Sequence, residues 1–466
     1  MMRPPSTHEQ VRRPTLCLLL AVHALLAGCA SYEPVPLEPA KELEALAHLT
    51  AESTAAAESP PHPVEALDLS DGASDAELVA IALRLNQELR AKRLEVGEAQ
   101  AFLVSAGIWP NPEVGFSWRA PLGDASGYQL DADLLIELLL PAERRAKKDA
   151  ALARIDEARA GVVAAEWQLV ARVRAQRLSV LAAENFSRLI ARELALREEA
   201  VSLVRRRREL GEGTELDIAA AELELGRIQR DSRLAQASLE SARRELNALL
   251  GLPPTYKLEL TGSAASLSTT VAQDVPDDEL DRRLLAGRFE LRALEASYQA
   301  AEHSLRAAVA RQYPHLKLGP SLSHEGSDGN YLGIGLALPI PLFDRNQGEI
   351  AERHVLRDKR RAEYVTLLHA LRSQAFEKNY DLRRARDELE AQERVLLPLL
   401  NRARGLFERA FQSRDISVLE WAAARERALE AERGHLEAVV RYRRAAVELE
   451  AAIGLPGAGG GRRDKP

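Results

Sequence analysis

Residues 128–141 read YQLDADLLIELLLP, and this stretch decides the fold. Apolar side chains occupy the even positions from Tyr128 to Leu138, whereas the odd positions hold Gln129, Asp131, Asp133, Leu135 and Glu137. A period of two puts these two sets on opposite faces of a β-strand. The run of about eleven residues suits a tilted strand that crosses a membrane. A soluble antiparallel hairpin with one dry face would show the same alternation, so this pattern alone leaves both possibilities open.

Three further runs alternate in the same way. The partner of the first strand spans 113–118, and a second pair spans 316–322 and 332–338. Turns rich in Gly and Asp join each pair, at 122–127 and 323–330. Four strands cannot close a barrel, and hydrocarbon does not tolerate an open sheet edge. Strands of this kind that span a membrane therefore require several copies of the chain, and three copies would supply twelve strands.

The strand pairs belong to an internal duplication. NQELRA at 86–91 aligns with RFELRA at 288–293, and LGLP at 250–253 aligns with IGLP at 453–456. Trp109-Pro110 likewise aligns with Tyr313-Pro314. The offset stays between 202 and 204, so the matches are collinear. The period is far longer than that of a solenoid repeat, which predicts two copies of one strand–helix unit.

Long helices are predicted after each strand pair. Residues 142–210 contain no proline, which predicts a helix about 100 Å long at about 1.5 Å per residue. Shorter helices are predicted at 76–107, 215–250, 279–311 and 417–453. Two short helices end to end match one long helix, which predicts a uniform wall of rods. Leucine recurs at every seventh residue, as in a coiled coil, at Leu189, Leu196, Leu203 and Leu210, and again at Leu382, Leu389 and Leu396.

The N-terminus is typical of an export signal. Arg3, Arg12 and Arg13 precede an apolar run from Leu16 to Ala27, which is too short for a permanent membrane span. The run ends in Leu-Ala-Gly-Cys29, which resembles a bacterial lipobox and predicts a lipid on the Cys29 thiol. The predicted organisation is a signal peptide (1–28), a Pro-rich tether (29–72), a first repeat (73–253), a connecting segment (254–276), a second repeat (277–456) and a disordered tail (457–466).

Composition excludes several classes of function. The net charge is −7 with both signs dispersed, so we predict no nucleic-acid binding. The sequence has no phosphate-binding Walker loop, no HExxH and no GxSxG, and its ten histidines are scattered. We therefore predict no enzyme activity, no catalytic residues, no metal centre and no cofactor apart from the lipid on Cys29. The histidines interpreted as surface or wall residues are His303, His315, His324, His354 and His369.

The mature chain resembles the TolC family of outer-membrane efflux proteins. LPIPLFDRNQG at 338–348 resembles the strand-to-helix junction of its CzcC-like heavy-metal branch. Pro339 and Pro341 end ladder pairing there, and Asp344 or Asn346 could cap the next helix. The first junction, LPAERR at 140–145, departs from that pattern.

The resemblance implies a mainly α fold with a transmembrane β part. A homotrimer would form a twelve-stranded barrel, four strands per protomer, continued by a long periplasmic helical barrel. Its implied partners are a periplasmic adaptor, an inner-membrane pump and the lipid of the outer membrane of a Gram-negative bacterium. Ala30 after Cys29, in place of Asp, favours the outer membrane by the same analogy.

The resemblance also places two helix turns at a periplasmic tip that meets the adaptor. The predicted docking residues are Gly211, Gly213, Thr214, Leu216, Ser417 and Leu419. Acidic side chains would ring the entrance at Glu215, Asp217, Asp415 and Glu420. A plain helical turn capped by Thr214 explains the first motif equally well, and the second turn lacks both glycines.

Three functions remain open at this point. The first is a passive exit duct for heavy-metal cations in a tripartite efflux system. The second is a drug or protein export duct of the same fold. The third belongs to another class, a lipid-anchored periplasmic coiled-coil structural protein.

Overall fold

The computed structural model describes residues 32–51, 69–120, 122, 127–262, 275–326, 329–413, 415–416 and 418–454. The chain divides into two units, residues 1–48 and 49–466. The first unit contributes helix α2 (Pro39–Ala47), which has no buried residue. The predicted signal peptide, Cys29 and the predicted tail at 457–466 lie outside the described residues.

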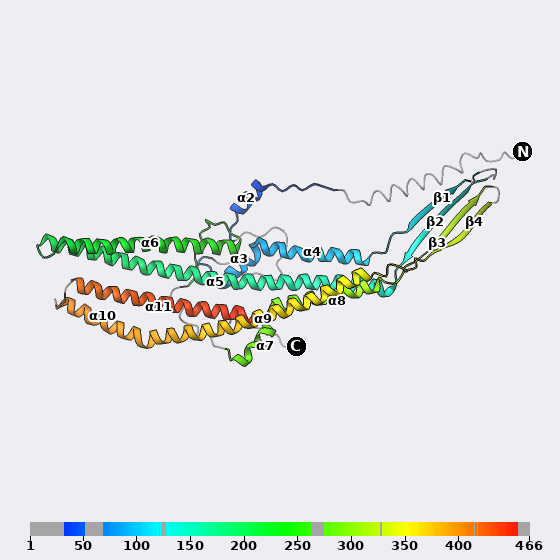
Figure 1. Cartoon of the computed structure of the whole chain (residues 1–466). Coiled ribbons are helices and arrows are strands. Elements are labelled where there is room, and N and C mark those ends of the chain that lie inside the picture. Colours follow the sequence, from blue (N-terminus) through cyan, green and yellow to red (C-terminus); the bar gives the residue numbers. More distant parts are fainter. Residues whose placement is uncertain are drawn as a thin grey trace. The chain divides into compact units, whose positions relative to one another are not determined.

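In the second unit, long helices run alongside one another and lead at one end into a four-stranded sheet (Figure 1). The described elements are α3 (Asp75–Leu85), α4 (Gln87–Gly107), β1 (Glu113–Arg119), β2 (Gln129–Leu138), α5 (Pro141–Glu209), α6 (Glu215–Leu250), α7 (Asp277–Gly287), α8 (Phe289–Ala310), β3 (Leu316–Glu325), β4 (Gly329–Ala337), α9 (Gln347–Ala391), a π-helical turn (Gln392–Leu396), α10 (Leu397–Gln412) and α11 (Val418–Ile453). Among the described helices, none combines the length and apolar character needed to cross a membrane.

The sheet is antiparallel throughout, in the order β1-β2-β3-β4. The register aligns odd positions with odd positions across all four strands, as in the pairs Ser117–Asp131, Asp131–Ser323 and Ser323–Tyr331. One face therefore collects the apolar even-numbered residues and the other the polar odd-numbered ones. The predicted alternation is confirmed, and β1 and β4 form the two edges.

The apolar face of the sheet is uncovered in the single chain. Phe116 and Trp118 in β1 are 76% and 68% exposed, and Leu332 and Ile334 in β4 are 77% and 80% exposed. Such a surface is far too apolar to face water. It suits contact with lipid, whereas the open edges need further strands.

Two cores repeat the same packing, which confirms the duplication. In the first repeat, α3, α5 and α6 bury Leu78, Leu169, Val173 and Leu250. The second repeat buries Leu280, Leu371, Ala375 and Ile453 at offsets of 202 or 203. Ala51 and Leu69 from the predicted tether also pack in the first core, and Val275 from the connecting segment packs in the second.

Each predicted short helix before a strand pair is in fact two helices. The break falls at Asn86 between α3 and α4, and at Arg288 between α7 and α8. The Asn86 amide donates to Leu249 O (3.0 Å), and the Arg288 guanidinium donates to Ala451 O. Both acceptors lie in the last turn of the helix that closes the repeat, so each break is held by that helix end.

The second long helix also differs from the prediction of an unbroken rod. A π-helical turn separates α9 from α10, and Pro398 follows it. A proline has no N–H and clashes with the carbonyl four residues earlier, so the helix widens there. The predicted leucine seam holds at Leu189 and Leu382, which are buried, whereas Leu210 in the turn is 72% exposed.

The two repeats differ in which groups form hydrogen bonds with the backbone just before α3 and α7. In the first repeat, Ala73 N donates to Glu259 O (2.8 Å) and Thr261 N donates to Ala73 O (3.1 Å). In the second, the buried Asn379 side chain takes the place of the segment 259–261. Its amide donates to Val275 O (2.8 Å), and its oxygen accepts from Val275 N (3.3 Å).

Asn379→Leu should therefore destabilise the second repeat by about 2 kcal/mol, because Val275 N loses its buried acceptor and Val275 O keeps only the donor from Arg383 (3.3 Å). The measurement is thermal unfolding of the purified protein followed by helical circular dichroism. Asn401→Leu on the exposed side of α10 is the matched control and should unfold as the wild type does. Equal unfolding temperatures for the two variants would contradict the assignment.

Candidate functional site

The first tip turn lies at the end of the helices remote from the sheet (Figure 1). It is closed by Gly211, whose φ of 79° lies in the left-handed region. Gly211 N donates to Arg208 O (3.0 Å) and Glu212 N donates to Arg207 O (2.9 Å), which satisfies the last carbonyls of α5. A residue with a side chain would be strained at position 211. The predicted turn is therefore present, and Gly213 lies within it.

Helix α6 starts with a reciprocal cap. Asp217 N donates to Thr214 Oγ1 (3.2 Å), while Asp217 Oδ2 accepts from Thr214 N (2.9 Å) and from its hydroxyl (2.8 Å). These bonds from the Thr214 backbone and side chain lower the pKa of Asp217 below its ordinary value of 3.8. Asp217 is thus a capping residue, whatever else it does.

The Thr214→Ala variant should lose about 1 kcal/mol of helix stability, because the first-turn N–H groups lose their acceptor. A protease that cuts after glutamate should then cleave faster at Glu212 and Glu215. The matched control is Thr366→Ala, whose hydroxyl only bonds back to Ala362 O within α9. Unchanged cleavage in Thr214→Ala would refute the capping role.

The lowered pKa of Asp217 sets a pH dependence for the same turn. A depressed folded-state pKa contributes stability at neutral pH that is lost as the pH falls through that pKa. The turn should therefore resist pepsin until the pH drops below about 3.8, the ordinary value for an aspartate. In Asp217→Asn, the rate of pepsin cleavage at the turn should vary with pH only as the activity of pepsin itself varies.

The other residues predicted at the first turn are exposed. Leu216 is 77% exposed beside the 72% exposed Leu210, so the turn presents two leucines to its surroundings. Glu215 lies 3.4 Å from Arg208 and Glu212 lies 3.9 Å from Arg207. The basic run Arg205–Arg208 thus offsets much of the acidic charge that the sequence analysis assigned to the entrance.

The second turn uses different contacts. Asp415 N donates to Ala410 O (2.9 Å), and Asp415 Oδ2 accepts from the Ser413 hydroxyl (2.5 Å). Glu420 is exposed at the start of α11. Ser417 and the side chain of Leu419 lie outside the described residues.

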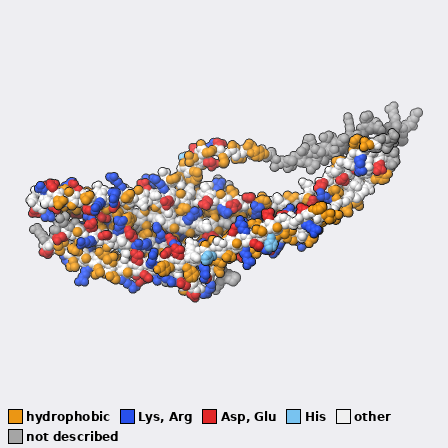
Figure 2. All heavy atoms as spheres, viewed as in Figure 1, with side chains coloured by type: hydrophobic (Ala, Val, Ile, Leu, Met, Phe, Trp, Pro, Cys, Tyr) orange, Lys and Arg blue, Asp and Glu red, His pale blue; other side chains and the backbone are white. Residues whose placement is uncertain are grey.

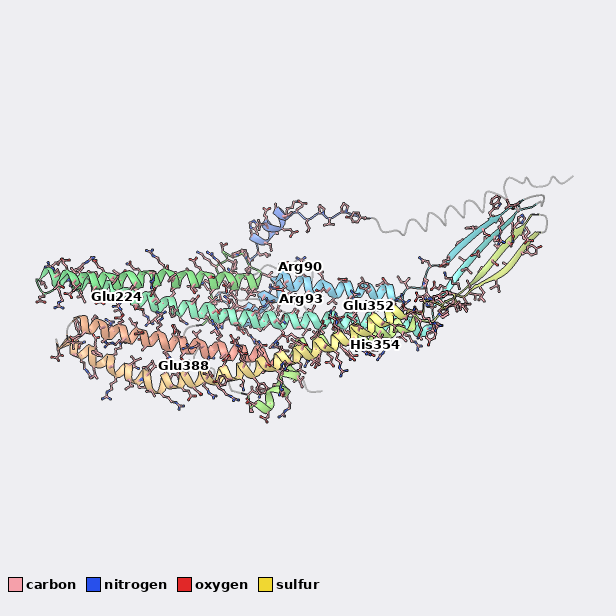
Figure 3. All side chains as sticks on the ribbon, in the orientation of Figure 1. Arg90, Arg93, Glu224, Glu352, His354 and Glu388 are labelled. Carbon is pink, nitrogen blue, oxygen red and sulfur yellow. The ribbon has the colours of Figure 1, made fainter. Side chains whose placement is uncertain are left out.

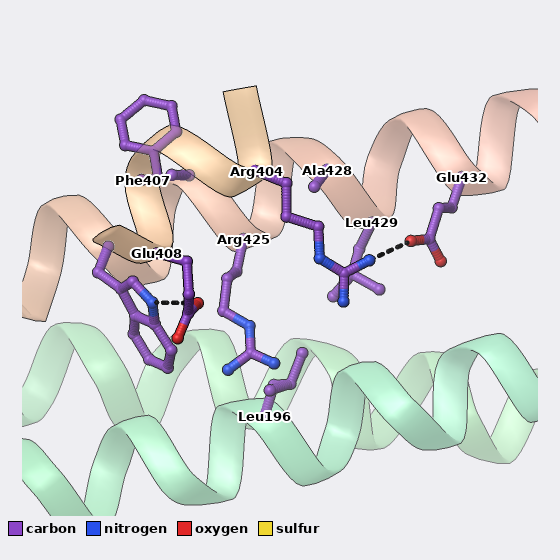
Figure 4. A pocket seen from close by; sticks show the side chains of 10 residues that line it. Leu196, Arg404, Phe407, Glu408, Arg425, Ala428, Leu429 and Glu432 are labelled. Carbon is purple, nitrogen blue, oxygen red and sulfur yellow. Dashed lines mark hydrogen bonds and ion pairs between the residues drawn. The ribbon is translucent and has the colours of Figure 1, made fainter. Parts of the chain in front are cut away.

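An aromatic cluster that the sequence analysis missed supports this turn. Trp421 is 7% exposed and stacks on Phe411 with ring centres 4.7 Å apart. Its Nε1 donates to Glu408 (3.3 Å), and the Arg425 guanidinium lies 4.6 Å from its ring centre. Figure 4 shows Glu408 and Arg425 beside a hollow that Trp421 and Leu196 of α5 also line. The only available signal was the scarcity of aromatic residues, which makes two so close to one turn unusual.

Charged pairs hold the long helices to one another along their length (Figure 3). Arg93 of α4 contacts Glu166 of α5 at 2.7 Å, and Arg441 of α11 contacts Glu388 of α9 at 2.7 Å. On the face seen in Figure 2, both signs of charge are interspersed over the helices. This face of the helical part thus presents mixed charge rather than a field of one sign.

The polar face of the sheet has a more definite character. Asp131 accepts hydrogen bonds from Ser117 (2.8 Å), Arg119 (3.0 Å) and Ser323 (2.6 Å), which ties three strands together. Lys317 lies 2.7 Å from Glu113. This face holds five carboxylates, at Glu113, Asp131, Asp133, Glu137 and Glu325, against two permanent cations, at Arg119 and Lys317.

The first junction, residues 138–143, is anchored in the chain by two buried residues, Leu139 and Glu143. His315, just before β3, contacts Glu137 at 2.5 Å and the fully buried Glu143 on its other ring nitrogen. Burial raises the pKa of Glu143, but hydrogen bonds from Lys147 and His315 outweigh it and leave the pKa lowered. His315, predicted as a surface or wall residue, therefore connects β2, α5 and the start of β3.

The second junction, residues 338–346, is built differently. Asn346 adopts a left-handed φ of 59°, and neither it nor Asp344 caps α9 with its side chain. The Asp344 carboxylate instead accepts from Asn346 N (2.9 Å), and the Asn346 amide donates to Ala308 O (2.8 Å). The predicted cap is therefore wrong, because Asn346 turns its side chain toward α8. Within the described residues, no group of three metal-ligating side chains is placed to hold an ion.

Comparison with known proteins fits this architecture. The model of the family described as "Outer membrane efflux protein" matches residues 78–252 and 280–455. The cobalt-zinc-cadmium resistance protein CzcC of Cupriavidus metallidurans is 25% identical over 368 residues, covering 78% of this chain and 84% of CzcC. The pyoverdine export outer membrane protein OpmQ of Pseudomonas putida is 27% identical over 322 residues, covering 64% and 66%.

Among solved structures, CusC has a TM-score of 0.66 at 18% identity and covers 86% of this chain and 99% of its own. This likeness confirms a TolC-like channel fold. The two family matches fall one in each copy of the duplication and together span most of the chain. The chain belongs to the outer membrane efflux protein family, whose members are outer-membrane channels with a large periplasmic part and not enzymes.

Proposed function

We propose that three copies of this chain form a passive exit duct for divalent heavy-metal cations. The charge of the polar sheet face is the observation that carries this proposal. In a closed barrel the apolar face meets lipid and the polar face lines the lumen. The lumen would then hold an excess of three negative charges per chain, from the five carboxylates and two cations in the strands. Fixed charge of one sign concentrates cations and repels anions.

The exposed apolar face and the open edges at β1 and β4 support the trimer. Only closure removes sheet edges within hydrocarbon, and about eight strands is the smallest barrel of this kind. Three copies of a four-stranded sheet reach twelve strands, whereas two copies reach only the lower limit. A pump in the inner membrane would supply the energy, and an adaptor would dock at the tip turns with their exposed Leu210 and Leu216.

The similarity to CzcC adds to the case for metal cations, since its name gives cobalt, zinc and cadmium resistance. Export of an organic compound is the second candidate, because OpmQ is named for pyoverdine and the relative TtgF for toluene. Deleting the gene and testing growth on these metals, siderophores and solvents decides between them. Sensitivity to metals alone supports the first proposal. Sensitivity to organic compounds alone replaces it with the second.

We further propose that Cys29 carries the lipid that anchors the mature N-terminus. Cells fed a labelled fatty acid should incorporate the label into the wild type and lose it in Cys29→Ser. The Cys17→Ser variant is the matched control and should keep full labelling, because Cys17 lies within the predicted signal peptide. Label in Cys29→Ser would refute the assignment.

A further inference from the structure

The two junctions between strand and helix occupy equivalent places in the duplication, yet only the first contains buried residues. In the first junction, Leu139 is 8% exposed and Glu143 is fully buried. In the second, Ile340 is 73%, Leu342 66% and Phe343 92% exposed. An exposed apolar run of this kind marks a contact surface.

The first junction is contacted by residues 315 and 316, which lead into the next strand, β3. Leu138 pairs with Leu316 across β2 and β3, and His315 bridges Glu137 and Glu143. Helix α5 packs along α8, which precedes that strand. The contact therefore joins the end of one repeat's strand pair to the start of the next pair.

For the second junction, which follows β4, the chain has no next strand pair that could supply the equivalent contact. Strand β4 is an edge, and so is β1. The segment that enters β1 is also apolar and uncovered. Val104 is 66%, Ile108 62% and Trp109 48% exposed, and Trp109 aligns with Tyr313 of the segment that enters β3. The chain thus carries both halves of a contact that it cannot make with itself.

We propose that residues 338–343 dock on residues 104–109 of a second copy of this chain. In both cases the partner of the junction is the segment that enters the next strand, within one chain for the first junction and in a second copy for the second. It rests on the proposed trimer, because barrel closure brings β4 of one copy antiparallel to β1 of the next. Contact between copies would bury the Phe343 side chain, and its neighbours Ile340 and Leu342 would share the same apolar surface.

Cysteine cross-linking tests the docking. The natural cysteines are Cys17 and Cys29 only, so a paired variant, Ile108→Cys with Phe343→Cys, can be compared with each single variant. After treatment of purified full-length protein with a short bifunctional maleimide, the paired variant should lose most of its monomer band on a denaturing gel to covalent dimer and trimer. The single variants should keep theirs. Ile108→Cys with Leu216→Cys is the matched control, since Leu216 lies at the remote tip and is also exposed.

The size of the untreated particle in detergent separates the two proposals. A trimer that does not cross-link through this pair overturns the docking and leaves the proposed duct standing. A monomer that does not cross-link overturns the trimer as well. A second measurement covers the case in which the two thiols are too poorly oriented to be cross-linked. Phe343→Asp should lower the dissociation temperature of the oligomer, and Ile108→Lys in the same chain should restore part of that temperature. Without that restoration, the docking is refuted even if both variants dissociate early.

Discussion

Gly251→Val is expected to remove most of the folded protein from the membrane fraction. Gly251 has a φ of 77°, and a Cβ on it would lie 2.4 Å from Leu85 O. The left-handed backbone costs about 1–2 kcal/mol for a residue with a side chain, and more for a β-branched one. Forcing atoms into the packed joint costs about 1–3 kcal/mol more. A total on the order of 4 kcal/mol is a large share of the stability of a typical domain.

The second repeat contains an equivalent glycine, and another glycine within α6 provides a control position. Gly454, with a φ of 73°, occupies the same place against the break at Arg288, so Gly454→Val should have a similar effect. Gly226 has open space around its Cβ position, and Gly226→Val should change stability by less than about 0.5 kcal/mol. The measurements are the amount of protein in washed outer membranes and the unfolding temperature of the purified material. Wild-type levels of Gly251→Val would mean that this joint is not what holds α3 against α6.

The sequence predicted the regular elements well because their periods are unambiguous. Helix α6 spans Glu215–Leu250, the predicted range, since Thr214 and Gly251 mark both of its ends. The breaks at Asn86 and Arg288 could not be predicted in the same way. The apolar spacing continues across them, and only the packed end of α6 or α11 shows why the chain turns there. Tertiary contact, and not local propensity, sets these boundaries.

The partners of the acidic site residues could not be predicted from the sequence, because acidic residues look alike until their contacts are known. The entrance role of Asp217 stays a prediction, and the structure adds that its carboxylate caps α6. The entrance role of Glu215 also stays a prediction, and its carboxylate lies 3.4 Å from Arg208. The strand carboxylates were predicted only as a polar face, and the register is what gathers those of three strands onto one surface. The excess of negative charge expected to favour cations therefore lies on the sheet and not at the tip.

Ion selectivity should follow the charge of that sheet surface. In planar bilayers at low salt, the wild-type channel should prefer cations, and Asp133→Asn with Glu325→Gln should reduce the preference several-fold. These two carboxylates form none of the ion pairs found among the described residues, so their loss should leave the network around Asp131 intact. Three copies would lose six of the nine excess negative charges. Raising the salt to about 1 M should shrink the difference, because the screening length falls to about 3 Å.

A substitution of opposite sign on the same face makes the test directional. Arg119→Gln removes a cation 3.0 Å from Asp131 and should increase the preference for cations. General damage to the channel would move both variants the same way, whereas the surface charge moves them apart. If the selectivity of all three proteins is equal, the sheet does not control passage, and the entrance at the tip must be tested with Glu215→Gln. Glu215→Gln suits that test better than Asp217→Asn, because loss of the Asp217 carboxylate would also remove the cap of α6.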